Sequence, residues 1–259
     1  MRSRLVAVGL VAALVLVLSP ALARAEGTVC GFETVLVPDG RIVESTIPGS
    51  TTFWFLMDLT SGRSYSVEIK SRIAQWGVYP GTATFRSATD SCGAATLVTT
   101  NTINNDPKIP NTARRVSFIA TAGGFHRIEL VNSSASAIEY SITISETTQF
   151  SPGWSTNGSY DSFYSLYNTT SSTITGTLTL FNTAGTAVTT QPVTIAAGAT
   201  TSTNTSAMGT VRNTTGTARL THNGPPGAIL AEAAIANFTI SPTPYFQFIH
   251  FEPTRDAAH

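Results

Sequence analysis

Short runs of alternating apolar and polar residues, separated by turn residues, cover most of the chain. In the run SYSVEIK (residues 64–70), Tyr65, Val67 and Ile69 fall on one face of an extended strand and the polar residues fall on the other. The preceding run TTFWFLMDL (residues 51–59) is a strongly apolar strand, and Ser-Gly-Arg at 61–63 is a turn. This pattern predicts a hairpin with one buried face.

The second half repeats the alternation with threonine on the polar face. In TITGTLTL (residues 173–180), Ile174, Leu178 and Leu180 share one face with Gly176, and threonines occupy the other. No segment keeps an apolar period of 3.6 residues, so helix is not expected. We predict an all-β chain of two tandem antiparallel β-sandwiches. Further strands are expected at residues 116–120, 125–131, 138–144, 188–195, 217–222, 228–238 and 245–251.

A change in charge content marks the domain boundary. Between residues 147 and 251 the only charged side chains are Asp161, Arg212, Arg219 and Glu232, whereas charges occur throughout the first half. Residues 147–158 contain Pro and two Gly without a sustained period, which is typical of a linker. We expect one sandwich over residues 26–146, a linker over 147–158, a second sandwich over 159–252 and a tail over 253–259.

The N-terminus has the pattern of a cleaved secretory signal peptide over residues 1–25. Arg2 and Arg4 precede an apolar stretch of about fourteen residues, too short to span a bilayer as a helix, and Ala-Arg-Ala ends the segment. Cleavage would lower Lys+Arg from 15 to 12 against 15 Asp+Glu, a net charge near −3. We expect a secreted protein, in the periplasm, at the cell surface or outside the cell, with no membrane insertion of the mature chain. Nucleic acid, which binds through clustered cations, is not an expected partner.

The two cysteines, Cys30 and Cys92, both lie in the first half. After export an oxidising environment favours their pairing. A bridge would close a loop of about 60 residues and contribute on the order of 4 kcal/mol on the chain-entropy model. The alternative is two free buried thiols.

The run TFWFLMDLTSGRSYSVEI (residues 52–69), with GGFHRIELVN (123–132) and EYSITIS (139–145), resembles the bacterial pre-peptidase C-terminal domain. The resemblance implies a jelly-roll-type sandwich that accompanies secreted peptidases or other surface enzymes as a non-catalytic module. We expect no peptidase domain ahead of it here, so the usual role as an enzyme's appendage does not carry over intact. The second half is loosely similar to immunoglobulin-like domains of bacterial surface proteins, through residues 166–185 and 221–229.

Catalytic and cofactor motifs are absent from the sequence. It has no Gly-x-Ser-x-Gly, His-Glu-x-x-His, Cys-x-x-Cys, phosphate-binding Gly-Lys-Ser/Thr or EF-hand-like pattern. The isolated histidines (His126, His222, His250 and His259) are interpreted as structural or surface residues, His126 sharing its strand face with Ile128 and Leu130. Residues 101–111 are rich in side-chain oxygens that could bind calcium, but the segment is interpreted as a turn. We therefore predict no enzyme, cofactor or metal site.

Aromatic residues are the remaining candidates for binding. Trp76 and Tyr79 lie in QWGVYP, a loop segment in which exposed rings would stack on sugars; the alternative is that both rings cap the sandwich core. Trp154 is expected to pack between the domains. The aromatic residues between positions 160 and 167 mix both strand faces, so some are expected to be exposed or to contact the other domain.

The leading hypothesis is a secreted, non-enzymatic binding or structural protein that engages an extracellular protein or polysaccharide through sandwich edges and loops. Self-association through exposed strand edges is a subsidiary expectation. The alternatives are a carbohydrate-binding accessory protein acting through loop aromatics and an unrecognised secreted hydrolase. Six Asn-x-Ser/Thr triplets, at Asn132, Asn157, Asn168, Asn204, Asn213 and Asn237, are assigned no function.

Overall fold

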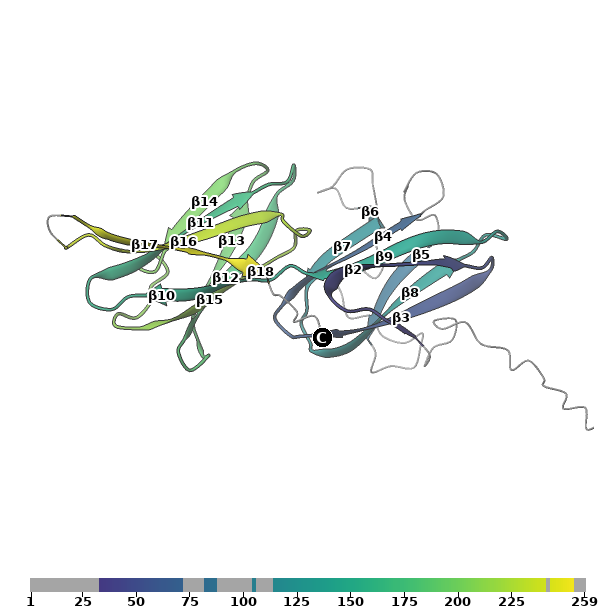
Figure 1. Cartoon of the computed structure of the whole chain (residues 1–259), viewed down its shortest axis with the longest axis horizontal. Coiled ribbons are helices and arrows are strands. Elements are labelled where there is room, and N and C mark those ends of the chain that lie inside the picture. The colour runs from purple at the N-terminus through teal and green to yellow at the C-terminus, as the bar shows by residue number, and fades with distance from the viewer. Residues whose placement is uncertain (1–32, 72–81, 88–103, 106–113, 241–242, 254–259) are drawn as a thin grey trace, which may run out of the picture.

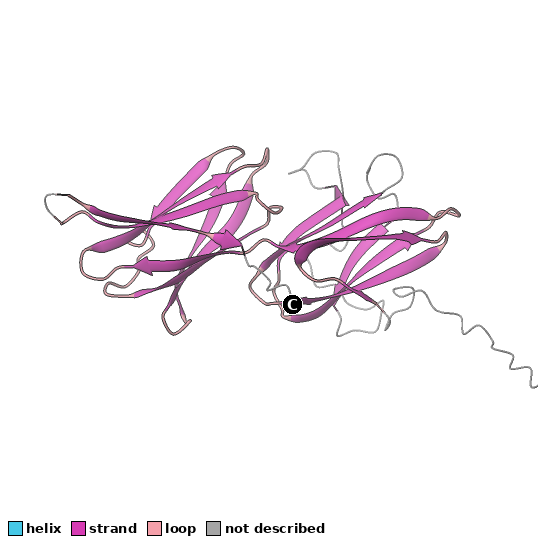
Figure 2. Cartoon of the chain, viewed as in Figure 1, coloured by secondary structure: helices cyan, strands magenta, loops and turns pink. Residues whose placement is uncertain are grey.

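The structure is a computed structural model that describes residues 33–71, 82–87, 104–105, 114–240 and 243–253. These residues form strands joined by turns and contain no helix, as Figure 2 shows. The prediction of an all-β chain is confirmed. Within the same ranges, no helix is long and apolar enough to cross a membrane. The expected signal peptide (1–25), Cys30 and Cys92 lie outside the described residues.

The first sandwich consists of two sheets, which we call sheets A and B. Sheet A has the strand order β1-β3-β8-β5 and sheet B the order β2-β9-β4-β7-β6. Pairing is antiparallel except for the short parallel pair of β1 and β3. The strands are β1 (Thr34–Val35), β2 (Asp39–Ile47), β3 (Thr51–Leu59), β4 (Ser64–Ser71), β5 (Thr82–Ser87), β6 (Asn104–Asn105), β7 (Arg114–Ile119), β8 (Gly124–Asn132) and β9 (Ile138–Glu146).

The second sandwich consists of sheets C and D, and all its pairs are antiparallel. Sheet C has the order β13-β12-β15-β10-β18 and sheet D the order β14-β11-β16-β17. Its strands are β10 (Gln149–Ser155), β11 (Tyr160–Asn168), β12 (Ile174–Asn182), β13 (Ala187–Ile195), β14 (Thr200–Asn204), β15 (Thr215–His222), β16 (Ile229–Asn237), β17 (Tyr245–His250) and β18 (Glu252–Pro253). In Figure 1 the two sandwiches lie end to end, and the β16–β17 hairpin extends away from the first sandwich.

The predicted strand faces form the two cores. Tyr65, Val67 and Ile69 are buried in the first core, as their alternation predicts. Ile174, Leu178 and Leu180 are buried in the second core. Period-two alternation therefore identified the inward side chains of both sandwiches.

The predicted hairpin of residues 51–59 and 64–70 is wrong, although both strands exist. β3 pairs with β1 and β8 in sheet A, whereas β4 pairs with β7 and β9 in sheet B. The turn between them crosses from one sheet to the other. It is fixed by the Gly62 N–H, which donates to Ala120 O at 2.7 Å, and by the Thr60 N–H, which donates to Tyr65 Oη at 2.9 Å.

The segment expected to be a linker is largely a strand. Residues 149–155 form β10, which pairs with β15 and β18. Its register shifts between Ser151 and Trp154, so Pro152 and Gly153 lie in an irregularity where a strand tolerates a missing donor. Only Thr147 and Thr148 separate β9 from β10.

The junction between the sandwiches is buried and hydrogen-bonded. Thr147 and Thr148 are both buried. The Thr147 N–H donates to Ser64 O at 2.8 Å, and the Ser64 N–H donates to Thr148 Oγ1 at 2.8 Å. Next to them, Arg63 pairs with Glu146 at 3.0 Å and lies 5.5 Å from the ring centroid of Phe150.

Candidate functional site

The outer face of sheet D carries exposed aromatic side chains, among them Phe246 and Phe248. Alternate residues of β16 point inward, including buried Ile229, Ala231 and Ala233. The intervening residues, among them Glu232 and Ala234, point outward. On the edge strand β17, Phe248 is 73% exposed. Exposed apolar patches of this kind on soluble proteins often mark binding surfaces.

Strand register arranges this face in two rows that run across the strands. In the first row, Phe163 on β11 lies opposite Ala234 on β16, and Ala234 lies opposite Phe248 on β17. Asn204 on β14 continues this row beyond Phe163. We call these four residues the aromatic row. Ala234, which has only a methyl side chain, separates the two phenylalanines. The sheet surface is therefore depressed between them.

The second row is polar and lies directly beside the first. Ser202 on β14 is opposite Ser165 on β11, Ser165 is opposite Glu232, and Glu232 is opposite His250 on β17. We call these four residues the polar row. Since residues two apart on a strand share a face, each position of the polar row adjoins one position of the aromatic row.

A hollow of about 350 Å³ lies over these rows. Its volume is in the range of small-ligand sites, which combine apolar walls with a few polar groups. The lining comes from all four strands of sheet D: Ser202, Thr203 and Asn204 on β14, Phe163, Tyr164 and Ser165 on β11, Glu232, Ala233 and Ala234 on β16, and Phe248 on β17.

Further aromatic rings extend the surface beyond the hollow. Phe238 contacts Phe163 edge to face, with ring centroids 5.7 Å apart, and contacts Phe246 in the same way at 5.4 Å. Tyr160 and Tyr245 form another edge-to-face pair at 5.8 Å, but on the opposite face of these strands, the face shared by Tyr164 and Ile249. The contacts of Phe238 join Phe163 to Phe246, while Phe238 and Phe246 themselves stay exposed to solvent.

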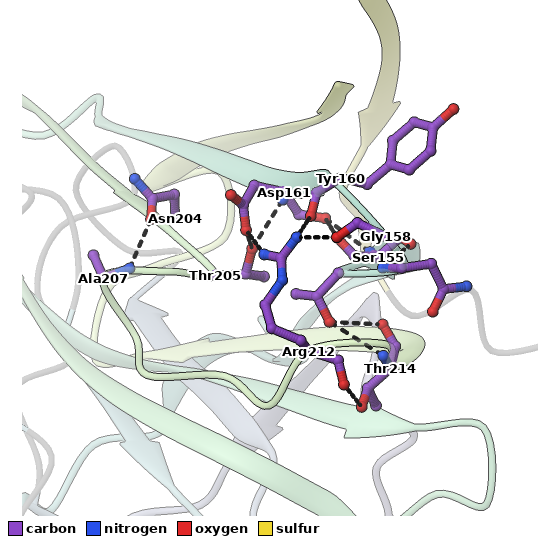
Figure 3. A network of polar contacts seen from close by, with 12 residues as sticks. Ser155, Gly158, Tyr160, Asp161, Asn204, Thr205, Ala207, Arg212 and Thr214 are labelled. Atoms are coloured by element: carbon purple, nitrogen blue, oxygen red, sulfur yellow. Dashed lines mark hydrogen bonds and ion pairs between the residues drawn. The ribbon is translucent and has the colours of Figure 1, made fainter. Parts of the chain in front are cut away.

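A polar network fixes the β14 side of the hollow, as Figure 3 shows. Asp161 Oδ1 on β11 accepts hydrogen bonds from Thr205 Oγ1 at 2.9 Å and Arg212 Nη1 at 2.6 Å. Arg212 Nη2 also donates to the carbonyls of Gly158 and Tyr160, each at 2.7 Å. The network ties the segment after β14 to the start of β11. It therefore holds the adjacent residue, Asn204, beside Phe163.

The electrostatic character of the hollow is set by one carboxylate. Glu232 is the charged side chain among the residues that line it, and its side chain is 67% exposed. The nearest imidazole, His250 Nδ1, lies 3.9 Å from Glu232 Oε1, which is longer than a hydrogen bond. The described lining residues include no lysine or arginine.

The site residues proposed from the sequence do not coincide with this surface. Trp76 and Tyr79 lie outside the described residues, so their role stays a prediction. Trp154 does not pack between the domains. It is 1% exposed in the core of the second sandwich, and its Nε1 donates to Phe181 O at 2.9 Å and Thr217 O at 3.0 Å.

The aromatic residues at positions 160–167 do divide between the two faces, as the mixed parity predicted. Tyr164 is buried, whereas Tyr167 is exposed and Phe163 lines the hollow. The contributions of Phe248 and Glu232 were missed. Both lie on strands that the sequence predicted, but the pairing that brings them beside Phe163 comes from the register of three strands.

The histidines are not assembled into a catalytic group within the described residues. His126 and His222 are buried on different sandwiches, and His126 shares the inward face with Ile128 and Leu130 as predicted. Burial lowers the pKa of both, that of His222 to about 4. His250 is exposed at the edge of sheet D, and His259 lies outside the described residues. Those residues also hold no group of three or more His, Cys, Asp and Glu placed to bind a metal.

No protein-family model and no curated protein matches the chain. Solved structures do match. The pre-peptidase C-terminal domain of a collagenase from Bacillus anthracis is 10% identical with a TM-score of 0.32, over 43% of this chain and 95% of that one. The periplasmic inhibitor of g-type lysozyme PliG from Aeromonas hydrophila is 13% identical with a TM-score of 0.34, over 44% of this chain and 96% of that one.

PliG from Salmonella Typhimurium is 12% identical with a TM-score of 0.28, over 44% of this chain and 98% of that one. The resemblance of the first half to the pre-peptidase C-terminal domain stays a prediction. The immunoglobulin-like character of the second half stays a prediction. These similarities lie at the level of a β-sandwich, and none of them identifies a family or an activity for this chain.

Proposed function

We propose that the protein is an exported, non-enzymatic binding protein whose second sandwich holds an extracellular partner on the outer face of sheet D. The observation that carries the proposal is the hollow over the aromatic row and the polar row. Export is supported by the N-terminal signal pattern. A non-enzymatic role is supported by the lack of catalytic motifs in the sequence.

A polysaccharide is the ligand class that the two rows fit best. Sugar rings present an apolar face that stacks on aromatic side chains and hydroxyl groups that hydrogen-bond to polar ones. Phe163 and Phe248 supply the aromatic surfaces, and Ser165 in the neighbouring row supplies a hydroxyl. A chain lying across the strands would meet both rows along its length.

Co-sedimentation with insoluble cell-envelope polysaccharide, cellulose, chitin and whole cells of the producing organism tests this proposal. We expect retention that Phe248→Ala abolishes. Phe125→Ala is the matched control, because Phe125 is a phenylalanine of the first sandwich that is 59% exposed. Retention that Phe248→Ala leaves intact would contradict the proposal, and loss in a parallel Trp76→Ala sample would instead place the site in the first domain.

An extracellular protein is the second candidate partner, and the edge strand β17 is the observation that favours it. Among the described strands β17 pairs only with β16, so its other edge has backbone groups available for strand addition. Phe246 and Phe248 flank that edge and are largely exposed. Phe246→Lys should abolish capture of a protein partner from whole cells. A monomer at high concentration in sedimentation equilibrium would count against self-pairing through this edge.

A further inference from the structure

The slot between Phe163 and Phe248 has the chemistry of a site for a positively charged group. We infer that it binds the ammonium group of an amino sugar within a polysaccharide. This inference rests on the proposed function, because it names the kind of glycan that the outer face of sheet D selects. Three features of the slot lead to it: the placement of the two phenylalanines on either side of Ala234, the charge beside them and the polar row next to them.

Phe163 and Phe248 flank the position above Ala234 on the outer face of sheet D. Phe163 and Phe248 are paired with the same residue, Ala234, from opposite sides, so their backbones lie two strand spacings apart. Strands in a sheet are about 4.8 Å apart, so a group above Ala234 lies about 5 Å from the backbone of each phenylalanine, within reach of both side chains. Cations are attracted to an aromatic face within about 6 Å of its centroid. The methyl side chain of Ala234 leaves the space between the rings open.

The charge of the slot complements an ammonium group. Glu232 is two residues from Ala234 on β16 and therefore adjoins the slot on the same face. His250 Nδ1 lies 3.9 Å from the carboxylate, too far for a hydrogen bond but within ion-pair distance when the imidazole is protonated. With no lysine or arginine among the described lining residues, the hollow disfavours uronic acids and phosphate groups.

The polar row favours an amino sugar over a lysine side chain of a protein. Ser165 and Ser202 continue from Glu232 toward β14, and Asn204 stands beside them in the next row. This places hydroxyl and amide groups along a line that starts at the carboxylate. A sugar ring carries its hydroxyl groups next to its amine and can use this line, whereas the methylene stem of a lysine cannot.

The test measures binding of soluble glucosamine oligomers and of the same oligomers in N-acetylated form, by calorimetry at mildly acidic pH in a His250→Asn background, which removes the imidazole beside Glu232. N-acetylation replaces the ammonium group by an uncharged acetamide, so the pair differs in charge and in one acetyl group. We expect the free amine form to bind about tenfold more tightly, as cation–π attraction and the Glu232 carboxylate together provide. Glu232→Gln should remove this preference and leave the acetylated form unaffected, Phe248→Ala should weaken both, and Phe125→Ala should change neither.

A second measurement tests the binding of a cation that is not part of a sugar. Choline should shift the amide resonances of β11, β16 and β17, and dimethylbutanol, its uncharged isostere, should do so at least about fivefold more weakly. Equal binding of the charged and uncharged partner in both pairs would overturn the inference while leaving the proposed function standing. Binding of a lysine-rich peptide in place of the amino sugar would overturn it too. Failure of all glycans, with Phe248→Ala without effect on any ligand, would instead remove the proposed function.

Discussion

Asn132 and Asn168 occupy the same corner in the two sandwiches. Each is the last residue of a strand, β8 or β11, and is buried. Asn132 Nδ2 donates to the carbonyls of Ile47, Pro48 and Ser136, at 3.2, 3.0 and 2.8 Å. Asn168 Nδ2 donates to the carbonyls of Ser172, Ile195 and Ala196, at 2.8, 3.0 and 3.0 Å. In each sandwich the amide joins a strand of one sheet to the end of a strand in the other.

The same two residues give a structural role to triplets that had been assigned no function. In Asn132-x-Ser134 and Asn168-x-Thr170, the asparagine Oδ1 accepts hydrogen bonds from both the N–H and the hydroxyl of the third residue. Asn237 and Thr239 repeat the arrangement. The Ser or Thr two positions after the asparagine therefore completes a turn.

Asn168→Asp should strongly destabilise the second sandwich. The carboxylate offers no donor to the three carbonyls and would be buried as an uncompensated charge, so we expect a loss of about 3 kcal/mol or more in the free energy of unfolding. Denaturant unfolding followed by tryptophan fluorescence measures it. Asn157→Asp, at an exposed triplet, is the matched control, and equal stability of the two variants would show that the corner does not depend on the amide.

Trp154→Phe should also destabilise the second sandwich, by about 1–3 kcal/mol, because it leaves the carbonyls of Phe181 and Thr217 without the indole N–H. Trp154→Ala should cost more, about 3–5 kcal/mol, through the cavity it leaves. If Trp154 acted between the domains, the variants would loosen the domains without lowering the midpoint of this unfolding transition. Thermal unfolding of the three proteins distinguishes the two roles.

Alternation in the sequence predicted which side chains point inward but not which strands pair. Tyr65, Val67 and Ile69 are buried as expected, since a period of two residues determines the face of a strand. The turn after β3 looks the same in sequence whether the next strand pairs with β3 or crosses to the opposite sheet. The hairpin prediction failed for that reason.

The candidate site could not be predicted from the sequence for a related reason. Phe163, Ala234 and Phe248 are more than eighty positions apart at the extremes, and only their register on three strands places them in one row. Pro152 and Gly153 led to the prediction of a linker where the structure has strand β10. A strand irregularity can contain the same residues as a linker.

Acid should destabilise the second sandwich through His222. Burial lowers the pKa of this imidazole from 6.5 to about 4 in the folded protein. The unfolded chain therefore binds more protons between these values, so the stability that is present above about pH 6.5 falls as the pH drops toward 4. The full loss is on the order of 3 kcal/mol.

Unfolding free energies measured between these pH values test the role of His222. In His222→Asn, the amide oxygen can replace Nδ1 as acceptor for the Gly224 N–H, which donates at 3.1 Å. The slope of the unfolding free energy against pH should then become shallower. Burial lowers the pKa of His126 as well, so some slope should remain from the first sandwich. The control is His250→Asn at an exposed position; a slope that His222→Asn leaves unchanged would rule out this imidazole as its source.

The coupling between the sandwiches should depend on the hydroxyl of Thr148. Thr148→Val keeps the shape of the side chain but removes the acceptor for the Ser64 N–H, which is buried at the junction. An unpaired buried N–H costs about 1–3 kcal/mol, so we expect the two sandwiches to unfold in more widely separated calorimetric transitions. Thr194→Val, at an exposed position on β13, controls for the substitution itself. If Thr148→Val unfolded like Thr194→Val, the junction would be held by the Arg63–Glu146 pair and the Thr147 backbone bond rather than by this hydroxyl.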